Sequence, residues 1–239
     1  MRDLDIIVLY NKKDMFNQMK ESADNVLDGI DYDIIGLDNT ENKYSSVAGA
    51  YNYAIDNLCD AKVLVFCHQD VVFFNDSLKK LINACNENEG VLFGAAGVNQ
   101  NGGPIISSIH QTTIGNRYKT LSKDEIKPIF ALDECLVAAS SNFFKQMKFD
   151  ETTCDGFHLY AHDLCYQCHL KGIEVKVIDL DMAHLSGGKL DSTFFDCLSK
   201  LCKKYKKDYK VLRYTWGQAY TNPLLSFAQR AYRKLRYKM

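Results

Sequence analysis

Residues Lys62–Asp70, with the sequence KVLVFCHQD, indicate the fold of this chain more clearly than any other stretch. The five apolar residues from Val63 to Cys67 are typical of a strand covered on both faces, and such strands occur in parallel sheets. The runs IIVLY at 6–10 and VLFGAA at 91–96 have the same character. Longer amphipathic segments separate these runs. Residues 1–96 therefore predict strands at 5–10, 32–37, 62–67 and 91–96, alternating with helices at 14–27, 45–58 and 76–86.

This alternation predicts an α/β fold, with a doubly wound, mostly parallel sheet and flanking helices. Further along, we expect a helix at 157–171, ended by Gly172, and a strand at 175–178. The 239 residues include only three prolines and no linker-like or repeated segment. We therefore expect one domain at 1–190 and a basic helical appendage at 191–239, packed on the same domain.

The two parts of the chain differ in charge. Residues 200–239 contain 12 Lys and Arg and one acidic residue, a charge of +11, and residues 1–199 carry −12. The acidic part argues against nucleic-acid binding. The last residues, 223–239, predict a basic amphipathic helix. Such a helix would either bind an anionic membrane surface or pack on the domain or on a second copy in a homodimer.

The sequence also predicts where the protein resides. It contains no apolar segment long enough to cross a membrane, and the N-terminus lacks the apolar region of a secretion signal. Nine cysteines, an odd number, predict free thiols and not a disulfide framework. We expect a cytoplasmic protein, which its basic helix would place peripherally at the inner face of the membrane.

Polar residues directly follow three of the predicted strands, at Tyr10–Asn11, Asp38–Asn39 and His68–Asp70. Ligands of doubly wound sheets bind beyond the carboxyl ends of the strands, so these residues are predicted to line one crevice. A carboxylate is costly to bury, and Asp70 is therefore either a ligand-binding group or a cap for the next turn. His184 precedes two glycines that allow a ligand to approach closely, and it is either a ligand or a structural histidine.

The helix predicted at 157–171 carries three further candidates. Asp163 lies among apolar residues near the helix start, which would raise its pKa toward that of a general base; helix N-terminal charge is the alternative explanation. His158 and His162 have the spacing of a zinc protease helix, but a leucine follows His158 where that chemistry needs glutamate. Glycine-rich nucleotide loops and the G-x-S-x-G motif are missing, which argues against dehydrogenases, P-loop NTPases and α/β-hydrolases.

Several segments share an order along the chain that is typical of one family. They are the three strand ends, SSVAGAYNYAID (45–56), VFCHQDVVF (65–73), DECLVAASSNFF (133–144), FDETTCDGFHLYAHDLCYQCHLKG (149–172) and DMAHLSGG (181–188). Over about residues 4–188 the chain resembles an inverting family-2-type glycosyltransferase of the GT-A fold. In particular, it resembles the glycosyltransferase-like branch in which an H-Q-D motif replaces the usual D-x-D.

The resemblance implies a nucleotide site and a cation site. Tyr10, Asn11, Asp38 and Asn39 would bind the base and ribose, and Asn52 would lie on the same nucleotide face.

The diphosphate would be met through a divalent cation, Mn²⁺ or Mg²⁺, held by Asp70 and completed by His184. His68 stands where the first D-x-D carboxylate would be. Because hard cations prefer oxygen ligands, the site is predicted to bind its cation weakly or not at all.

The resemblance also implies acceptor-side residues and a base. Asp163 corresponds to the carboxylate that removes the proton from the acceptor hydroxyl. Asp133 matches an acceptor-side position with Glu134 beside it, and His158 and His162 are assigned to substrate binding on the same side.

The implied function is transfer of a sugar from a nucleoside-diphosphate donor, with UDP favoured, to a hydroxyl group with inversion at the anomeric carbon. The enzyme would be hexosyltransferase-like, and the acceptor would be a glycan, a lipid-linked sugar or a protein-linked glycan, as in polysaccharide biosynthesis. The alternative is a catalytically silent module that binds a nucleotide sugar or a glycan, because His68 replaces a carboxylate.

Overall fold

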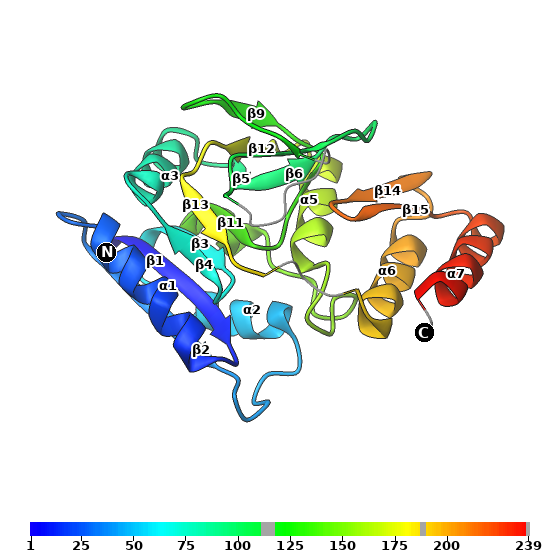
Figure 1. Cartoon of the computed structure of the whole chain (residues 1–239), viewed down its shortest axis with the longest axis horizontal. Coiled ribbons are helices and arrows are strands. Elements are labelled where there is room, and N and C mark those ends of the chain that lie inside the picture. Colours follow the sequence, from blue (N-terminus) through cyan, green and yellow to red (C-terminus); the bar gives the residue numbers. More distant parts are fainter. Residues whose placement is uncertain (111–117, 187–189, 238–239) are drawn as a thin grey trace.

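The computed structural model of the chain describes residues 1–110, 118–186 and 190–237. Its centre is a seven-stranded sheet with the order β2-β1-β3-β11-β5-β12-β9 (Figure 1). The strands are β1 (Arg2–Tyr10), β2 (Tyr32–Asp38), β3 (Ala61–Cys67), β5 (Leu92–Gly94), β9 (Ile126–Pro128), β11 (Leu136–Ser140) and β12 (Val175–Ile178). β1, β2, β3, β5 and β12 run in one direction, and β9 and β11 run antiparallel to their neighbours. The mostly parallel α/β sheet expected from the sequence is thus confirmed, with the difference that β11 separates β3 from β5.

Helices cover both faces of this sheet. The first face packs against α2 (Val47–Asn57), α4 (Ser141–Gln146) and α5 (Tyr160–Leu170), and the second against α1 (Lys13–Val26) and α3 (Ser77–Glu87). β3 shows why its sequence is continuously apolar. Leu64 and Phe66 lie in the core beneath α2 and α5, whereas Val63, Val65 and Cys67 lie in the core beneath α1 and α3. Burial on both faces is the reason that the strand tolerates no alternation with polar residues.

Short strands beside the main sheet position the polar residues that follow β3. β4 (Val71–Phe73) pairs with β13 (Met182–His184), and the register places His184 opposite Val71, next to Asp70. A four-stranded sheet holds β6 (Ala96–Val98), β7 (Ile105–Ser107), β8 (Tyr118–Lys119) and β10 (Ala131–Leu132). The run 91–96, predicted as one strand, is therefore divided between β5 and β6.

The C-terminal part consists of α6 (Ser192–Lys204), a hairpin of β14 (Val211–Tyr214) and β15 (Gly217–Tyr220), and α7 (Pro223–Tyr237). The hairpin was not anticipated by the prediction of a helical appendage. Phe194 and Leu198 of α6 and Leu212 of β14 are buried in the same core as α2 and α5. The C-terminal segment therefore packs on the main body, and it shares one core with it.

None of the helices that the structure describes is long and apolar enough to span a bilayer. The predicted basic face of residues 223–239 depends on Arg230, Arg233, Lys234, Arg236 and Lys238, whose side chains lie outside the described residues. All nine cysteines are free thiols, and eight of them are buried.

Candidate functional site

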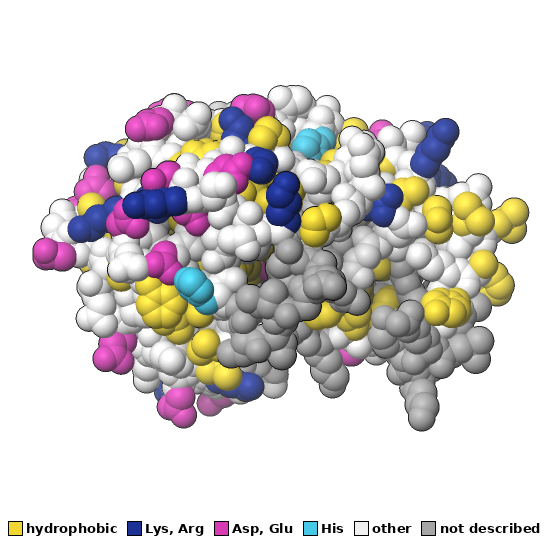
Figure 2. Space-filling model, turned by 45° about the horizontal axis from the view of Figure 1, so that its top comes forward, with side chains coloured by type: hydrophobic (Ala, Val, Ile, Leu, Met, Phe, Trp, Pro, Cys, Tyr) yellow, Lys and Arg dark blue, Asp and Glu magenta, His cyan; other side chains and the backbone are white. Residues whose placement is uncertain are grey.

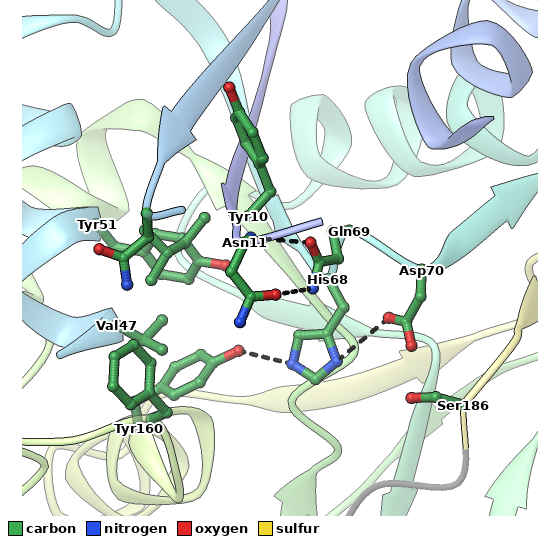
Figure 3. Close-up of a pocket in the computed structure, with 12 residues that line it drawn as sticks. Tyr10, Asn11, Val47, Tyr51, His68, Gln69, Asp70, Tyr160 and Ser186 are labelled. Atoms are coloured by element: carbon green, nitrogen blue, oxygen red, sulfur yellow. Dashed lines mark hydrogen bonds and ion pairs between the residues drawn. The ribbon is translucent and has the colours of Figure 1, made fainter. Parts of the chain in front are cut away.

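A pocket of about 230 Å³ lies where the carboxyl ends of β1, β2 and β3 meet (Figure 3). The strand ends contribute Tyr10, Asn11, Asn39, His68, Gln69 and Asp70 to its lining. Phe157 and Tyr160, near the start of α5, and Ser186 also line it. The crevice predicted from the strand ends is therefore present, and four of the six residues predicted to contact the donor line it.

Gln69 fixes the relative positions of the β1 and β3 ends. Its Oε1 accepts hydrogen bonds from the backbone N–H groups of Asn11 (3.0 Å) and Lys12 (2.8 Å). Its Nε2 donates to Asn11 Oδ1 at 2.9 Å (Figure 3). The two strand ends are thus joined by side-chain bonds where no sheet pairing continues, and the Asn11 side chain is held at the pocket.

Asp38 and Asn39 have different surroundings although they are adjacent in sequence. The buried Asn39 accepts a hydrogen bond from the Tyr44 N–H through Oδ1 (2.7 Å) and donates to the Tyr44 carbonyl through Nδ2 (3.2 Å). Asp38 is exposed, and hydrogen bonds from the Thr40 backbone and hydroxyl lower its pKa. Burial and the neighbouring Asp38 carboxylate raise the pKa of Tyr10. Asp38 therefore lies beside Tyr10 as an ionised group, outside the pocket lining.

Asn52 lies in α2, outside the pocket lining. Its Nδ2 donates to the Phe149 carbonyl (2.9 Å) and to Glu151 Oε1 (2.7 Å), and its Oδ1 accepts from the Phe149 N–H (3.1 Å). The structure thus gives this amide a scaffolding role between α2 and the segment that precedes α5. It does not bring Asn52 together with the other predicted nucleotide residues.

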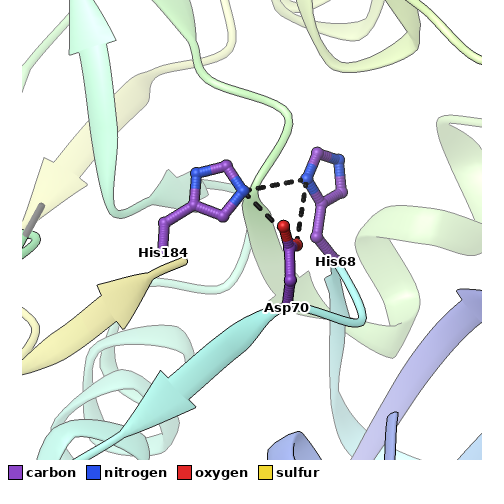
Figure 4. A group of neighbouring side chains, drawn as sticks. All are labelled: His68, Asp70 and His184. Carbon is purple, nitrogen blue, oxygen red and sulfur yellow. Dashed lines mark hydrogen bonds and ion pairs between the residues drawn. The ribbon is translucent and has the colours of Figure 1, made fainter. Parts of the chain in front are cut away.

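His68, Asp70 and His184 converge at one side of the pocket (Figure 4). His184 Nε2 lies 3.4 Å from Asp70 Oδ1 and 3.4 Å from His68 Nδ1, and His68 Nδ1 lies 4.0 Å from Asp70 Oδ1. Two imidazole nitrogens and one carboxylate oxygen therefore lie within 4.8 Å of one another. Asp70 and His184, predicted as the cation site, are brought together, and His68 joins them.

Tyr160 determines which ring nitrogen of His68 carries a lone pair that faces this cluster. The Tyr160 hydroxyl donates its proton to the Glu134 carbonyl (3.0 Å) and lies 3.2 Å from His68 Nε2. Because the hydroxyl proton is already used, Nε2 is assigned as the donor to the hydroxyl oxygen. Nδ1 then carries the lone pair and points toward Asp70 and His184. In metal-binding histidines, the ring nitrogen that does not contact the metal usually donates a hydrogen bond, as Nε2 of His68 does here.

The charges of the cluster are set by burial and by mutual contact. Burial, together with the neighbouring His184, lowers the pKa of His68 to about 4, so its ring is neutral at pH 7. Burial alone would lower the pKa of His184, but the hydrogen bond and charge of Asp70 raise it overall. Burial opposes ionisation of Asp70, yet hydrogen bonds from His184 and Ser186 hold its pKa well below the usual range. An ionised carboxylate beside a neutral imidazole is a donor set suited to a divalent cation of the Mn²⁺ type.

A second possible group consists of Asp133, Cys135 and His184. Burial raises the pKa of the Cys135 thiol well above its usual value, so its sulfur is protonated. Asp133 accepts a hydrogen bond from the Cys135 N–H at 3.0 Å. Burial would raise its pKa, but the nearby His184, His162 and His68 lower it overall. Asp133 is therefore an ionised, half-buried carboxylate beside the cluster, and the trio with His68 is the better candidate for a cation.

Asp163 has a different environment. Its side chain is completely buried and accepts hydrogen bonds from Lys204 Nζ (2.6 Å), the Tyr205 hydroxyl (2.8 Å) and Gln167 Nε2 (2.7 Å). Burial raises its pKa, although Lys204 acts in the opposite direction. Asp163 does not line the pocket. These contacts are those of a structural ion pair, and they give no support to the base role predicted for this residue.

The remaining acceptor-side candidates surround the start of α5. Burial, and then the adjacent Asp133, raise the pKa of Glu134 well above its usual value, and its Oε1 has no partner among the described residues. His162 Nε2 lies 3.4 Å from the Thr215 N–H, and burial lowers the pKa of His162 to about 4. His158 Nε2 lies 3.6 Å from Asp191 Oδ1, and burial lowers its pKa. Glu134 and His162 are thus uncharged polar groups near Asp133.

Sequence reasoning did not assign the roles of His68 and Tyr160 in this site, or identify the lysine that pairs with Asp163 outside it. His68 was interpreted as the loss of a cation ligand, although its separation from Asp70 by one residue is a signal for a shared site. Tyr160 orients His68 and had no signal, because a tyrosine at the start of a helix is usually a core residue. Lys204 pairs with Asp163 and belongs to the basic C-terminal segment, where a lysine is usually solvated.

The sequence of the chain also matches a known protein family. A family model described as "Glycosyltransferase like family" matches residues 5–211, which is most of the chain. The chain belongs to this family. The resemblance inferred from the motifs is thereby confirmed at the level of a glycosyltransferase family, and the replacement of D-x-D by H-Q-D stays a prediction.

Solved structures and curated sequences give more distant similarities. A crystal structure of GalNAc-T7 with UDP, GalNAc and Mn²⁺ is similar with a TM-score of 0.55 and 10% identity, over 84% of this chain and 48% of that chain. This similarity concerns the fold, which is of the GT-A type. The protein named "ATP synthase subunits region ORF 6" from Fuscovulum blasticum is 23% identical over 159 residues. The match covers 62% of this chain and 61% of that relative.

Proposed function

We propose that the protein is an inverting glycosyltransferase that uses a nucleoside-diphosphate sugar. The observation that carries the proposal is the convergence of His68, Asp70 and His184 beside a strand-end pocket, in a chain of a glycosyltransferase-like family. The crystal structure with a similar fold holds UDP, GalNAc and Mn²⁺. This supports a UDP-type donor and a Mn²⁺-type cation here.

The nucleotide is proposed to occupy the pocket between Tyr10, Asn11 and Asn39. Gln69 holds the Asn11 amide in place, and Asn39 closes the loop that follows β2. The ionised Asp38 beside Tyr10 is available to accept hydrogen bonds from a base or ribose. Asn52 is proposed to support this nucleotide face indirectly, because its amide forms hydrogen bonds with the backbone of the segment that precedes α5.

The diphosphate is proposed to lie toward His68, Asp70 and His184, which would hold the divalent cation. When bound, such a cation neutralises the charge that develops on the leaving diphosphate. Two nitrogen ligands favour Mn²⁺ over Mg²⁺, since Mg²⁺ strongly prefers oxygen. The chain itself contributes the neutral His68 ring, oriented by Tyr160, and the carboxylate of Asp70.

The base is proposed to be Asp133. A general base must be ionised and must reach the hydroxyl proton that it removes. Neither carboxylate lines the pocket, but Asp133 is ionised and half-buried and lies beside His184 of the cation cluster, whereas Asp163 is buried and bonded to three donors. Removal of the hydroxyl proton lets the acceptor oxygen attack the anomeric carbon opposite the leaving diphosphate, and one such displacement inverts the configuration. Asp163 is kept as the alternative implied by the resemblance.

The acceptor is proposed to be a sugar hydroxyl of a glycan, either free or linked to lipid or protein, in polysaccharide biosynthesis. Glu134, His158 and His162 lie around the start of α5, and as uncharged or partly buried polar groups they suit the hydroxyl groups of a sugar. One observation favours the catalytically silent binding module instead, namely the ion pair that occupies Asp163.

Thermal shift with UDP, GDP, CDP and dTDP, each with and without Mn²⁺, tests the donor site. One nucleotide should raise the melting temperature, with a larger increase in Mn²⁺. His184→Ala should abolish the Mn²⁺-dependent part. His110→Ala is the matched control, because His110 lies 2.8 Å from Asp181 in a second His–Asp pair, which is more exposed than that of His184 and Asp70. Absence of any nucleotide shift, or an equal loss in both variants, would contradict the proposal.

Transfer itself separates the enzyme from the silent module. Sugar transfer from the stabilising donor to a panel of glycan acceptors, or slow hydrolysis of that donor, indicates an enzyme. Donor binding with neither activity would favour the silent module.

A further inference from the structure

Helix α7 places polar residues toward the protein. Ser226 and Gln229 are half-buried, and Gln229 attaches the helix to the hairpin. Its Oε1 accepts from the Tyr220 N–H at 3.2 Å, and its Nε2 donates to the Gln218 carbonyl at 2.8 Å. The first turns of α7 are therefore attached to the β14–β15 hairpin through hydrogen bonds of an amide side chain.

The same turns of α7 carry large apolar side chains on the outside. Leu224, Leu225 and Phe227 are 81%, 52% and 75% exposed. Figure 2 shows hydrophobic side chains projecting from the right-hand end of the molecule, where Figure 1 places α7. A surface helix of a globular protein normally has the opposite arrangement, with apolar residues inward and polar residues outward. Exposed apolar side chains that are grouped in this way are typical of an interaction surface.

A basic pocket of about 730 Å³ adjoins the start of α7. Lys206, Lys207 and Lys210 line it from the segment between α6 and β14, and Pro223 and Leu225 line it from α7. Its described lining contains no acidic residue, and no described carboxylate forms an ion pair with any of the three lysines. Three ammonium groups that form no ion pair with a described carboxylate therefore lie next to the outward apolar face, in a segment whose one acidic residue is Asp208.

We propose that these three lysines and the outward face of α7 dock the protein on an anionic phospholipid bilayer. The ammonium groups would meet lipid phosphates, and Leu224, Leu225 and Phe227 would enter the boundary between headgroups and acyl chains. Basic and apolar groups side by side on one surface are the combination that binds bilayer interfaces. This proposal does not depend on the activity proposed for the pocket at the strand ends.

The combination of charged and apolar groups favours the bilayer over two other occupants of this surface, a second copy of the chain and a nucleic acid. A second copy placed on the same surface would bring two sets of lysines together, and residues 200–239 already carry +11. A nucleic acid would meet the lysines but would leave the leucines and the phenylalanine against a charged backbone. An anionic bilayer provides a partner for both kinds of group.

Vesicle co-sedimentation tests the proposal with the full chain. The vesicles are phosphatidylcholine alone or phosphatidylcholine mixed with phosphatidylglycerol. The protein should pellet with the mixed vesicles only. Combined Lys206→Gln, Lys207→Gln and Lys210→Gln should lower the partition coefficient about 100-fold, since each lysine near an anionic surface contributes about fivefold. Leu224→Ser with Phe227→Ser should lower it about tenfold or more by removing buried apolar area.

A matched control removes three exposed lysines elsewhere, by combined Lys20→Gln, Lys43→Gln and Lys123→Gln. This control has the same net charge as the first variant and should keep its binding to the mixed vesicles. All the substituted side chains are exposed, so melting temperatures should stay close to that of the wild type. The proposal is wrong if the wild type stays in the supernatant with the mixed vesicles, or if the control loses binding as strongly as the first variant. It is also overturned by a lipid-free dimer that Phe227→Ser converts to a monomer.

Discussion

Substitution of Lys204 by methionine tests whether Asp163 is a structural group. Lys204 Nζ lies 2.6 Å from Asp163 Oδ1 and 2.7 Å from Asp150 Oδ2. The Asp163 side chain is completely buried, and the Lys204 side chain is 28% exposed. Lys204→Met would leave the Asp163 carboxylate with only neutral donors, from Tyr205 and Gln167. Removing one partner of a buried ion pair typically costs 3–5 kcal/mol, and the partial exposure of Lys204 places the expected loss near the lower end, at about 3 kcal/mol.

The pKa directions in this pair predict a second result. The pKa of Lys204 is raised despite its burial, which indicates attraction, but the pKa of Asp163 is also raised, because burial outweighs that attraction. The pair therefore stabilises the fold little compared with two neutral groups, whereas breaking it is costly. We expect Lys204→Met combined with Asp163→Asn to recover most of the lost stability.

The pH dependence has a definite sign. A carboxyl group whose pKa is raised in the folded state destabilises the fold when it is ionised. That cost is absent below its unfolded pKa of about 3.9, grows as the pH rises from there to the folded pKa, and is complete above the folded pKa. The loss caused by Lys204→Met should therefore shrink as the pH is lowered from 7 toward 4.

Urea unfolding at several pH values measures these differences, and melting temperature is a second readout. A loss of about 3 kcal/mol corresponds to about 10 °C for a domain of this size. Lys200→Met is the matched control on the same helix, because Lys200 forms an exposed pair with Asp155, and it should change the stability far less than Lys204→Met. Equal losses in both variants, or a cost for Lys204→Met that does not depend on pH, would refute the reasoning.

Three further predictions concern the pocket and the sheet. Asp133→Asn should lower the transfer rate by about 10²–10⁴-fold with little change in donor affinity. Steady-state kinetics measures this, and retained activity would exclude Asp133 as the base. Gln69→Ala should weaken donor binding about tenfold, because the backbone N–H groups of Asn11 and Lys12 lose their acceptor. Calorimetry measures this, and unchanged affinity would contradict it. Gly94→Ala should cost about 1–3 kcal/mol, because its Cβ would lie 2.9 Å from a backbone oxygen of β11 and 2.8 Å from a leucine methyl group. Gly156→Ala, with no atom of the described residues within 4 Å of the added Cβ, should be nearly neutral in the same unfolding assay.

Much of the fold was predictable because it depends on local patterns. The continuous apolar runs at β1 and β3 follow from burial on both faces, which the two cores beneath the helices confirm. The insertion of β11 between β3 and β5 was not predictable. Both neighbours of β11 lie far from it along the chain, and its own run LVAAS is short.

The candidate site was predictable in part for the same reason. Tyr10 ends β1, whereas Asn11, Asn39 and Asp70 follow strands, and strand ends in a parallel sheet meet at one edge. The environment of Asp163 was not predictable. The sequence around Asp163 is compatible both with a general base and with a structural group. Its contact with Lys204, 41 residues away, distinguishes these two roles.

The α/β class, the strand ends that form the pocket and the charge difference between residues 1–199 and 200–239 all follow from local sequence. These features depend on the identity of neighbouring residues and on the period of a strand or helix. The folded chain was needed to show that His68 joins Asp70 and His184, that Asp163 is held in an ion pair, and that α7 turns its apolar side chains outward. Each of these depends on contacts between segments distant along the chain. Burial and hydrogen-bond partners from distant segments determine whether the same side chain binds a ligand, supports the core or remains exposed.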